Sequence, residues 1–148
     1  MSFSQLVSNL KNVNIYQYQK LFKYEAFLKM YSGLEWKQYI NFSNQNYQRE
    51  LMYRDLDFEI YTISWPSIVE SKIHNHANYG CLMKVMQGKI DEKLYTPTLD
   101  LKKTNKLKTN QISYIDDSIG YHSISNPYTN NAVSLHIYSP PLHKTEYF

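Results

Sequence analysis

From Asn46 onwards, apolar and polar residues alternate in short runs, and this period of two limits the possible folds more than any other feature. Asp, Asn, Gly and Pro residues separate the runs, as is typical of turns between strands. No helical pattern intervenes. Strands are predicted over residues 46–53, 57–65, 69–76, 80–87, 89–96, 107–115, 119–125 and 132–138. Eight short strands in series favour an all-β barrel or jelly roll.

The first forty residues have a different pattern, because their apolar residues recur at helical spacing. A broad apolar stripe predicts a helix over residues 16–31, and Trp36 anchors a shorter helix predicted over Glu35–Ile40. Residues 1–40 are therefore expected to form a helical cap on a barrel of residues 46–148. The 148 residues contain no internal repeat and no low-complexity segment, so we expect a single domain.

Composition excludes several classes of protein. Hydrophobic residues make up 43% of the chain, which is enough for a packed core and excludes a disordered chain. A net charge of +3 does not suggest a nucleic-acid partner, and no apolar run approaches the roughly 18 residues of a membrane span. The start of the chain lacks the order of a secretory signal, and the single cysteine, Cys81, excludes an internal disulfide. We expect a cytoplasmic monomer that binds small molecules.

Only two of the sixteen basic residues are arginines, Arg49 and Arg54. Because lysine serves almost everywhere else, an arginine at a particular position suggests that its planar fork is needed there. The densest basic stretch, residues 102–108, holds four lysines and is interpreted as a solvated loop between strands.

The five histidines are His74, His76, His122, His136 and His143. The first two lie in the stretch Ser-Lys-Ile-His-Asn-His. In a strand, residues i and i+2 project to the same face, so both imidazoles can bind one metal ion. This spacing alone is a weak signal, because it arises often by chance and a lone histidine is more often packed or exposed than ligating.

A wider pattern surrounds this pair. Four residues separate His76 from Cys81, six more precede Gly88, and His122 lies four positions before Asn126. The arrangement resembles the two motifs of the cupin superfamily, H-x-H-x4-E-x6-G and a later H-x3-N. Two departures stand out. Cys81 occupies the place where most cupins have a glutamate ligand, and the second motif lacks its usual preceding proline.

The replacement of that glutamate by cysteine points to one family. Five stretches of the sequence look like type I cysteine dioxygenase. They are Ser-Lys-Ile-His-Asn-His, Tyr-Ile-Asp-Asp-Ser-Ile-Gly-Tyr-His, Ala-Val-Ser-Leu-His-Ile-Tyr-Ser-Pro-Pro, Glu-Trp-Lys-Gln-Tyr and Asn-Tyr-Gln-Arg-Glu-Leu. The resemblance runs from about Trp36 to Pro141. It implies a cupin barrel and an Fe(II)-dependent thiol dioxygenase that converts L-cysteine and O2 to cysteine sulfinic acid.

The resemblance also implies a set of iron ligands and a substrate contact. His74, His76 and His122 match the three ligands, and imidazole is a suitable ligand for Fe(II). Three neutral histidines leave the +2 charge uncompensated, which favours binding of a thiolate. Arg49 matches the arginine that binds the substrate carboxylate with two parallel hydrogen bonds, and Tyr47 matches an auxiliary contact.

Other matches lie beside the metal. Cys81 and Tyr138 match a pair that becomes a thioether cross-link, a possible protein-derived cofactor. Ser134, His136 and Tyr138 match a hydrogen-bonded relay, and Trp65 matches a tryptophan near it. Residues 133–138 alternate in the required way, with three apolar side chains on one face and these three polar ones on the other.

Two alternatives remain open: a dioxygenase for another small thiol, such as mercaptopropionate or cysteamine, and a non-catalytic cupin that binds a metal or a small ligand. Arg49 favours a substrate with a carboxylate. Members of the family usually continue well beyond Ser-Pro-Pro, whereas this sequence stops at Phe148, so a more open barrel mouth is expected. Thr145 stands where many relatives have a cysteine. His143 and Arg54 match no functional position and are expected at the surface.

Overall fold

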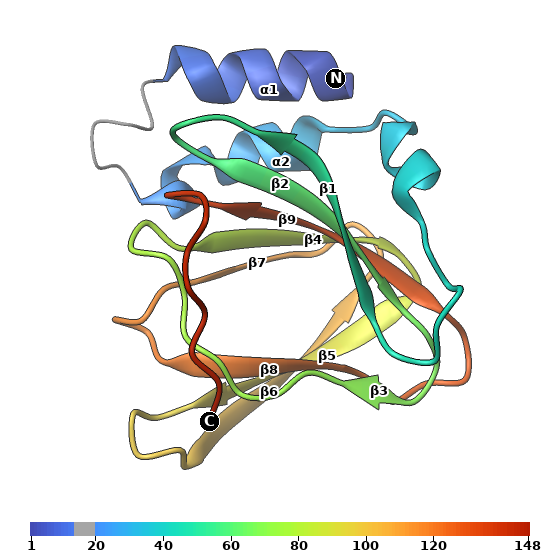
Figure 1. Cartoon of the computed structure of the whole chain (residues 1–148), viewed down its shortest axis with the longest axis vertical. Helices are drawn as coiled ribbons and strands as arrows, with labels where there is room; N and C mark the ends of the chain where they lie inside the picture. Colours follow the sequence, from blue (N-terminus) through green and yellow to red (C-terminus); the bar gives the residue numbers. More distant parts are fainter. Residues whose placement is uncertain (14–19) are drawn as a thin grey trace.

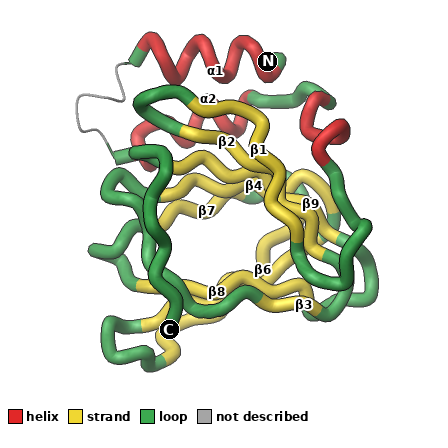
Figure 2. Tube along the Cα trace, viewed as in Figure 1, coloured by secondary structure: helices red, strands yellow, loops and turns green. Residues whose placement is uncertain are grey.

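The computed structural model describes residues 1–13 and 20–148. In this part of the chain, the strands form two antiparallel sheets that face each other (Figures 1 and 2). The larger sheet contains β1 (Gln48–Arg54), β2 (Glu59–Trp65), β9 (Ala132–Tyr138), β4 (Cys81–Gln87) and β7 (Ile112–Ile115), in that order. The smaller contains β3 (Val69–Glu70), β8 (Tyr121–Asn126), β5 (Lys89–Tyr95) and β6 (Leu101–Lys108). The prediction of a mainly β barrel is confirmed.

The N-terminal helices cover the outer face of the larger sheet (Figure 2). They are α1 (Phe3–Asn12), the 3-10 helix η2 (Leu21–Tyr24), α2 (Glu25–Met30) and the 3-10 helix η3 (Glu35–Tyr39). Leu10 and Leu28 pack in one core cluster with Leu135 of β9. The predicted helical cap is therefore confirmed, although residues 16–19 of the helix expected over 16–31 lie outside the described residues. None of the described helices is long and apolar enough to cross a membrane.

Strand β9 is buried on both faces, which explains its alternating sequence. Val133, Leu135 and Ile137 contact the helical cap, whereas Ser134 and His136 face the barrel interior and are almost fully buried. The barrel interior is closed by a second apolar cluster with side chains from both sheets, including those of Ile63, Met83, Ile90 and Ile124. The polar face of β9 consequently lines the inside of the barrel and not its surface.

A buried lysine ties the cap to the sheet. Lys84 of β4 is 4% exposed and points toward the helices, where its Nζ donates to the carbonyl oxygens of Leu28 at 3.1 Å and Tyr31 at 2.8 Å. These carbonyls lie at the end of α2, where no further helical turn supplies a donor. Burial lowers the pKa of Lys84. The lysine thus supplies the Tyr31 carbonyl with a donor and adds a second donor to the Leu28 carbonyl, which also accepts from the main-chain N–H of Tyr31.

Two predicted strands and one predicted loop were wrong. The strand expected over 69–76 ends at Glu70, and His74 beyond it forms only isolated bridges. The strand expected over 107–115 is broken at Asn110, whose φ of +73° turns the chain from β6 into β7 in the other sheet. The lysine-rich stretch expected as a loop lies within β6, an edge strand of the smaller sheet. Lysines are typical of edge strands because their charge discourages pairing with another chain.

Candidate metal centre

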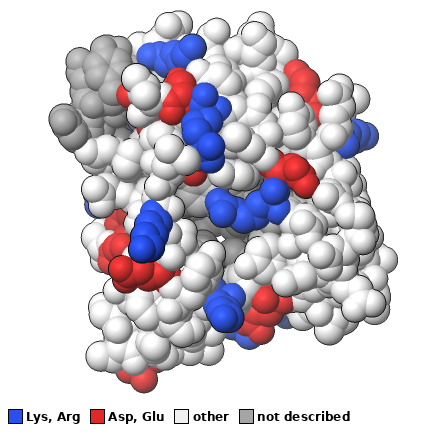
Figure 3. Space-filling model, viewed as in Figure 1, with Lys and Arg blue, Asp and Glu red and all other residues white. Residues whose placement is uncertain are grey.

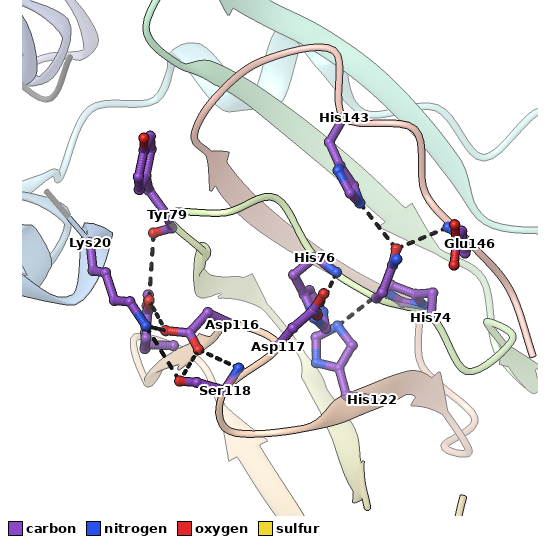
Figure 4. A network of polar contacts seen from close by, with 12 residues as sticks. Lys20, His74, His76, Tyr79, Asp116, Asp117, Ser118, His122, His143 and Glu146 are labelled. Carbon is purple, nitrogen blue, oxygen red and sulfur yellow. Dashed lines mark hydrogen bonds and ion pairs between the residues drawn. The ribbon is translucent and has the colours of Figure 1, made fainter. Parts of the chain in front are cut away.

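Three histidines from distant parts of the chain converge inside the barrel. His122 projects from β8, whereas His74 and His76 lie in the loop that follows β3. Their ligand atoms all lie within 4.8 Å of one another, and the Nε2 atoms of His74 and His122 are 3.1 Å apart (Figure 4). The loop bridges to β8 through main-chain hydrogen bonds between His74 and His122, which hold the two rings together.

Each of these imidazoles has an oxygen acceptor at Nδ1. The distances are 2.8 Å from His74 to the carbonyl oxygen of Lys72, 3.2 Å from His76 to Asp117 Oδ1 and 2.8 Å from His122 to Glu92 Oε2. An acceptor at Nδ1 places the ring proton there, so the lone pair is left on Nε2. All three Nε2 lone pairs are therefore available for one ion.

The geometry fits a metal ion. His76 Nε2 is buried and has no hydrogen-bond partner among the described residues. Two lone pairs only 3.1 Å apart, as in His74 and His122, repel each other unless a cation lies between them. Imidazole nitrogens ligate first-row metals at about 2.1 Å, so two such ligands at right angles lie about 3.0 Å apart. Burial lowers the pKa of both His74 and His76 to about 4, which keeps them neutral and able to bind metal near pH 7.

The opposite wall of the barrel holds a chain of hydrogen bonds on the larger sheet. Trp65 Nε1 donates to Ser134 Oγ at 2.8 Å, and Ser134 Oγ lies 2.7 Å from His136 Nε2. His136 Nδ1 lies 3.2 Å from the hydroxyl of Tyr138. The predicted relay residues are thus connected in one line from β2 to β9. Burial lowers the pKa of His136 well below its ordinary value, so this ring is neutral.

Cys81 lies next to this relay. It is the cross-strand partner of Tyr138 in the pairing of β4 with β9, and its Sγ lies 3.7 Å from His136 Nδ1. The thiol is free and 2% exposed, and burial raises its pKa. The structure therefore brings Cys81 and Tyr138 side by side.

Arg49 projects into the same space from β1. Its guanidinium lies 4.3 Å from the ring centre of Tyr61 and 5.5 Å from that of Tyr138. Among the described residues no carboxylate forms an ion pair with Arg49, whereas Arg54 pairs with Glu59 at 2.8 Å. Arg49 thus faces the pocket without a direct ion pair among the described residues, and Glu59, which lines the same pocket and attracts its charge, is paired with Arg54.

Most of the predicted site residues line a single pocket. These are Tyr47, Arg49, Trp65, His74, His76, His122, His136 and Tyr138. Cys81 and Ser134 lie behind its wall and are buried. On the face shown in Figure 3 the molecule is hollowed near its centre, with basic side chains beside the hollow and acidic ones nearby.

The C-terminal segment, residues 142–148, runs across the gap between the sheets (Figure 1). Its main chain pairs with the ligand-bearing loop, since Asn75 N–H donates to the Glu146 carbonyl at 3.1 Å. Asn75 Oδ1 accepts from Glu146 N–H at 2.9 Å and lies 3.0 Å from His143 Nε2 (Figure 4). The expectation that His143 lies free on the surface was wrong, because the ring is half-buried and lines the pocket with Thr145 and Tyr147.

Two carboxylates that hold the histidines were not predicted from the sequence. Glu92 sits on β5, and Asp117 lies in the turn before β8. Asp117 does stand in the stretch Tyr-Ile-Asp-Asp-Ser-Ile-Gly-Tyr-His, but no spacing rule links it to His76. For Glu92 the sequence offers no signal, because it stands between two other charged residues, Asp91 and Lys93, in a central strand of the smaller sheet.

Comparison with known proteins agrees with this geometry. A family model described as cysteine dioxygenase type I matches residues 2–148. The chain belongs to the cysteine dioxygenase type I family. Human cysteine dioxygenase type 1 is 35% identical to it over 127 residues, which are 79% of this chain and 64% of the human protein. The bovine enzyme of the same name is 36% identical over 115 residues, 72% of this chain and 58% of that one. The chain therefore spans about three fifths of the length of these relatives.

Solved structures with the same fold confirm the cupin barrel of this cysteine dioxygenase family member. A Klebsiella pneumoniae protein with a double-stranded β-helix domain has a TM-score of 0.64 at 14% identity, covering 77% of this chain and 94% of that one. A cupin superfamily protein from Desulfitobacterium hafniense has a TM-score of 0.58 at 12% identity, covering 73% and 90%. At these identities the likeness concerns the fold alone.

Proposed function

We propose that the chain is an Fe(II)-dependent thiol dioxygenase that converts L-cysteine and O2 to cysteine sulfinic acid. One observation carries the proposal: a centre of three neutral imidazoles faces Arg49, which has no carboxylate partner among the described residues, within one pocket. Such a pocket has a place for a cation on one wall and a place for an anion on the other. A small molecule with a thiolate and a carboxylate fits both.

The three histidines would hold the iron through Nε2. Bound ferrous iron would bring the thiolate and O2 together at one centre and carry electrons between them. His74, His76 and His122 add no negative charge of their own, so the ion's charge favours ionisation of the incoming thiol. Both oxygen atoms of O2 end on sulfur, which loses four electrons as O2 gains four, and no other reductant is needed.

Arg49 binds the substrate carboxylate in this proposal. Its planar fork can donate two parallel hydrogen bonds, a geometry that lysine cannot reproduce. The rings of Tyr61 and Tyr138, which meet edge to face, both contact the guanidinium and help to hold it in place. Tyr47, which packs in a tilted arrangement on Trp65 at a centroid distance of 4.9 Å, lines the same pocket and serves as an auxiliary contact.

The hydrogen-bonded line from Trp65 to Tyr138 fixes the Tyr138 hydroxyl. Ser134 and His136 are buried, so their hydrogen bonds are not exchanged for water. The hydroxyl is thereby held over the pocket, where it donates to a substrate oxygen or to the carboxylate beside Arg49. Ser134 and His136 act on the reaction only through this tyrosine.

The test is product analysis. The protein is loaded with Fe(II) and incubated in air with L-cysteine, mercaptopropionate or cysteamine, while O2 uptake and sulfinate products are followed by mass spectrometry. We expect uptake of one O2 per cysteine and the sulfinate of cysteine as the main product. Preference for mercaptopropionate or cysteamine would move the assignment to another thiol, and iron binding without O2 uptake would indicate a non-catalytic cupin.

The two arginines supply a matched pair of variants. Arg49→Lys should lower kcat/KM for cysteine by roughly 10–100-fold, because lysine keeps the charge but loses one of the two parallel hydrogen bonds, which is worth about 1.5–3 kcal/mol. Arg54→Lys preserves the ion pair with Glu59 and should leave turnover within about twofold of wild type. Equal effects of the two variants would contradict the carboxylate assignment.

We also propose that Cys81 and Tyr138 form a thioether during turnover. Joining Sγ to a ring carbon removes the S–H and C–H hydrogens, a loss of two electrons and two protons for which O2 is the oxidant. Their cross-strand pairing supports this. After incubation with iron and cysteine, a second band on a denaturing gel and a mass lower by the two hydrogens are expected, and Cys81→Ser should abolish both. An unchanged intact mass after many turnovers would contradict the cross-link.

A further inference from the structure

Glu92 is a buried acid on the smaller sheet that the proposed reaction does not use. The residue is 1% exposed. Its Oε2 accepts from His122 Nδ1–H at 2.8 Å, and its Oε1 accepts from Ser113 Oγ–H at 2.7 Å. Both carboxylate oxygens are thus bonded, one of them to the ring of a candidate metal ligand.

No lysine or arginine pairs with this carboxylate in the described part of the chain, where its one ion-pair contact is His122. Both carboxylate oxygens are placed to accept hydrogen bonds, from His122 and from Ser113, an arrangement that suits the ionised form. A buried anion of this kind is costly unless a cation lies close by.

We infer that Glu92 is the positioning residue that supplies the metal centre with its negative charge, through the imidazole of His122. The inference rests on the proposed metal centre and deepens it. In the cupin pattern H-x-H-x4-E-x6-G a glutamate binds the metal directly, and here Cys81 occupies that position. In this chain a glutamate carboxylate, that of Glu92, still belongs to the site, but it lies on another strand and is separated from the ion by the imidazole of His122.

This displacement has a chemical consequence. A carboxylate in direct contact would occupy a coordination position and offset half of the ion's charge. Glu92 leaves that position free for substrate while it polarises His122, fixes its tautomer and makes Nε2 a stronger donor. The centre can therefore bind a thiolate and still retain its metal.

The acceptors of the other two histidines are weaker. Lys72 offers His74 a neutral carbonyl oxygen, and Asp117 is 45% exposed and 3.2 Å from His76. Water screens an exposed carboxylate far more than a buried one. Glu92 is accordingly expected to contribute more to metal affinity than Asp117.

The test is Glu92→Gln in the full chain, because the amide preserves the shape, its oxygen can accept from His122, and its NH2 group can donate to Ser113 Oγ in place of the present bond. Anaerobic titration with Fe(II) should give an affinity about tenfold weaker than wild type. The Fe(III)/Fe(II) potential should rise, because loss of a negative charge favours the ferrous ion. The metal-free variant should be no less stable than metal-free wild type, because the amide removes an uncompensated buried charge.

Asp91→Asn is the matched control. Asp91 neighbours Glu92 on β5, is also buried and accepts from the Tyr128 hydroxyl at 2.7 Å, away from the histidines. Its variant should leave the iron affinity and the potential unchanged. If Glu92→Gln does not fold, Glu92→Asp and Glu92→Asn replace it, since they are equally short and differ only in charge, and Asp should bind iron more tightly.

The outcomes separate the two proposals. If wild type binds iron and oxidises cysteine while Glu92→Gln has the same affinity and potential, the inference is overturned and the proposed function stands. Loss of stability in metal-free Glu92→Gln, with unchanged affinity, would assign Glu92 a structural role only. If wild type binds no iron, both proposals fall together.

Discussion

The two sheets of the barrel contribute opposite kinds of chemistry to the pocket. The smaller sheet and its loops carry neutral imidazoles backed by oxygen acceptors, with His122 on β8 and Glu92 on β5. The larger sheet carries donors and a cation, with Arg49 on β1 and Tyr138 on β9. One wall is therefore suited to a metal cation and the other to an anion.

The sheets also differ in what covers them. The larger sheet packs the helical cap against its outer face, held by Lys84, whereas the outer side of the smaller sheet carries exposed lysines on β6. Consequently the residues of the larger sheet have two tasks, since β9 packs the cap with one face and holds the relay with the other. Changes in that sheet should affect stability and chemistry together, and changes in the metal wall should affect chemistry first.

The largest expected difference between the walls follows from exchanging one histidine on each. His122→Ala removes a proposed ligand, so bound iron and measurable turnover should both be lost. His136→Ala should retain iron but lower turnover by roughly 10–100-fold, because it only releases Tyr138. Metal analysis and O2 uptake measure the two effects separately. Equal loss of iron from both variants would contradict the assignment of metal binding to the smaller sheet and its loops alone.

The metal wall should also respond to acid in the metal-free protein. Burial lowers the pKa of His76 from 6.5 to about 4. Above pH 6.5 both the folded and the unfolded chain hold this ring neutral. As the pH falls from 6.5 to 4 only the unfolded chain takes up the proton, so stability is lost in this window, on the order of 3 kcal/mol for His76.

Urea unfolding at a series of pH values measures this loss. His76→Gln should flatten the pH dependence between 6.5 and 4, because the variant has no ring to protonate at that position. A profile as steep as that of wild type would show that His76 is protonated in the folded state.

Lys84 tests the larger sheet's structural task. Lys84→Met leaves the Tyr31 carbonyl without its donor, removes one of two donors to the Leu28 carbonyl, and should cost about 2 kcal/mol of unfolding free energy. Iron affinity should not change, because the side chain points away from the barrel interior toward the cap. Equilibrium urea unfolding and iron titration measure the two quantities. A weaker iron affinity would mean that the cap and the metal wall are coupled.

Sequence patterns predicted the barrel because alternation is a local property of each strand. The face of β9 that holds Ser134 and His136 follows from its period of two, and this is why a line of relay residues could be expected. The same rule misassigned residues 71–76, which make single main-chain hydrogen bonds to β8 and to the C-terminal segment but form no ladder beyond the isolated bridges of His74. Alternation alone does not reveal whether a partner strand is present.

Residues that act across the barrel could not be predicted in the same way. Glu92 meets His122 because β5 and β8 are neighbours, a fact of sheet order that no local spacing contains. Lys84 is charged yet 4% exposed, and only the position of the cap explains it. His143 was misassigned for the same reason, because its partner Asn75 lies 68 positions away.

The smallest expected effect concerns the segment that joins the two walls at the pocket mouth. His143→Ala removes the contact with Asn75 Oδ1, the residue between two proposed ligands, but the main-chain bonds of residues 146 and 148 to the loop remain. A single neutral hydrogen bond contributes about 1 kcal/mol, so KM for cysteine should rise by roughly fivefold or less, with iron affinity nearly unchanged. Lys144→Ala, at an exposed neighbouring position, is the control and should change neither. If His143→Ala has the same kinetic constants as Lys144→Ala, the His143 ring contributes nothing to substrate binding, although it lines the pocket.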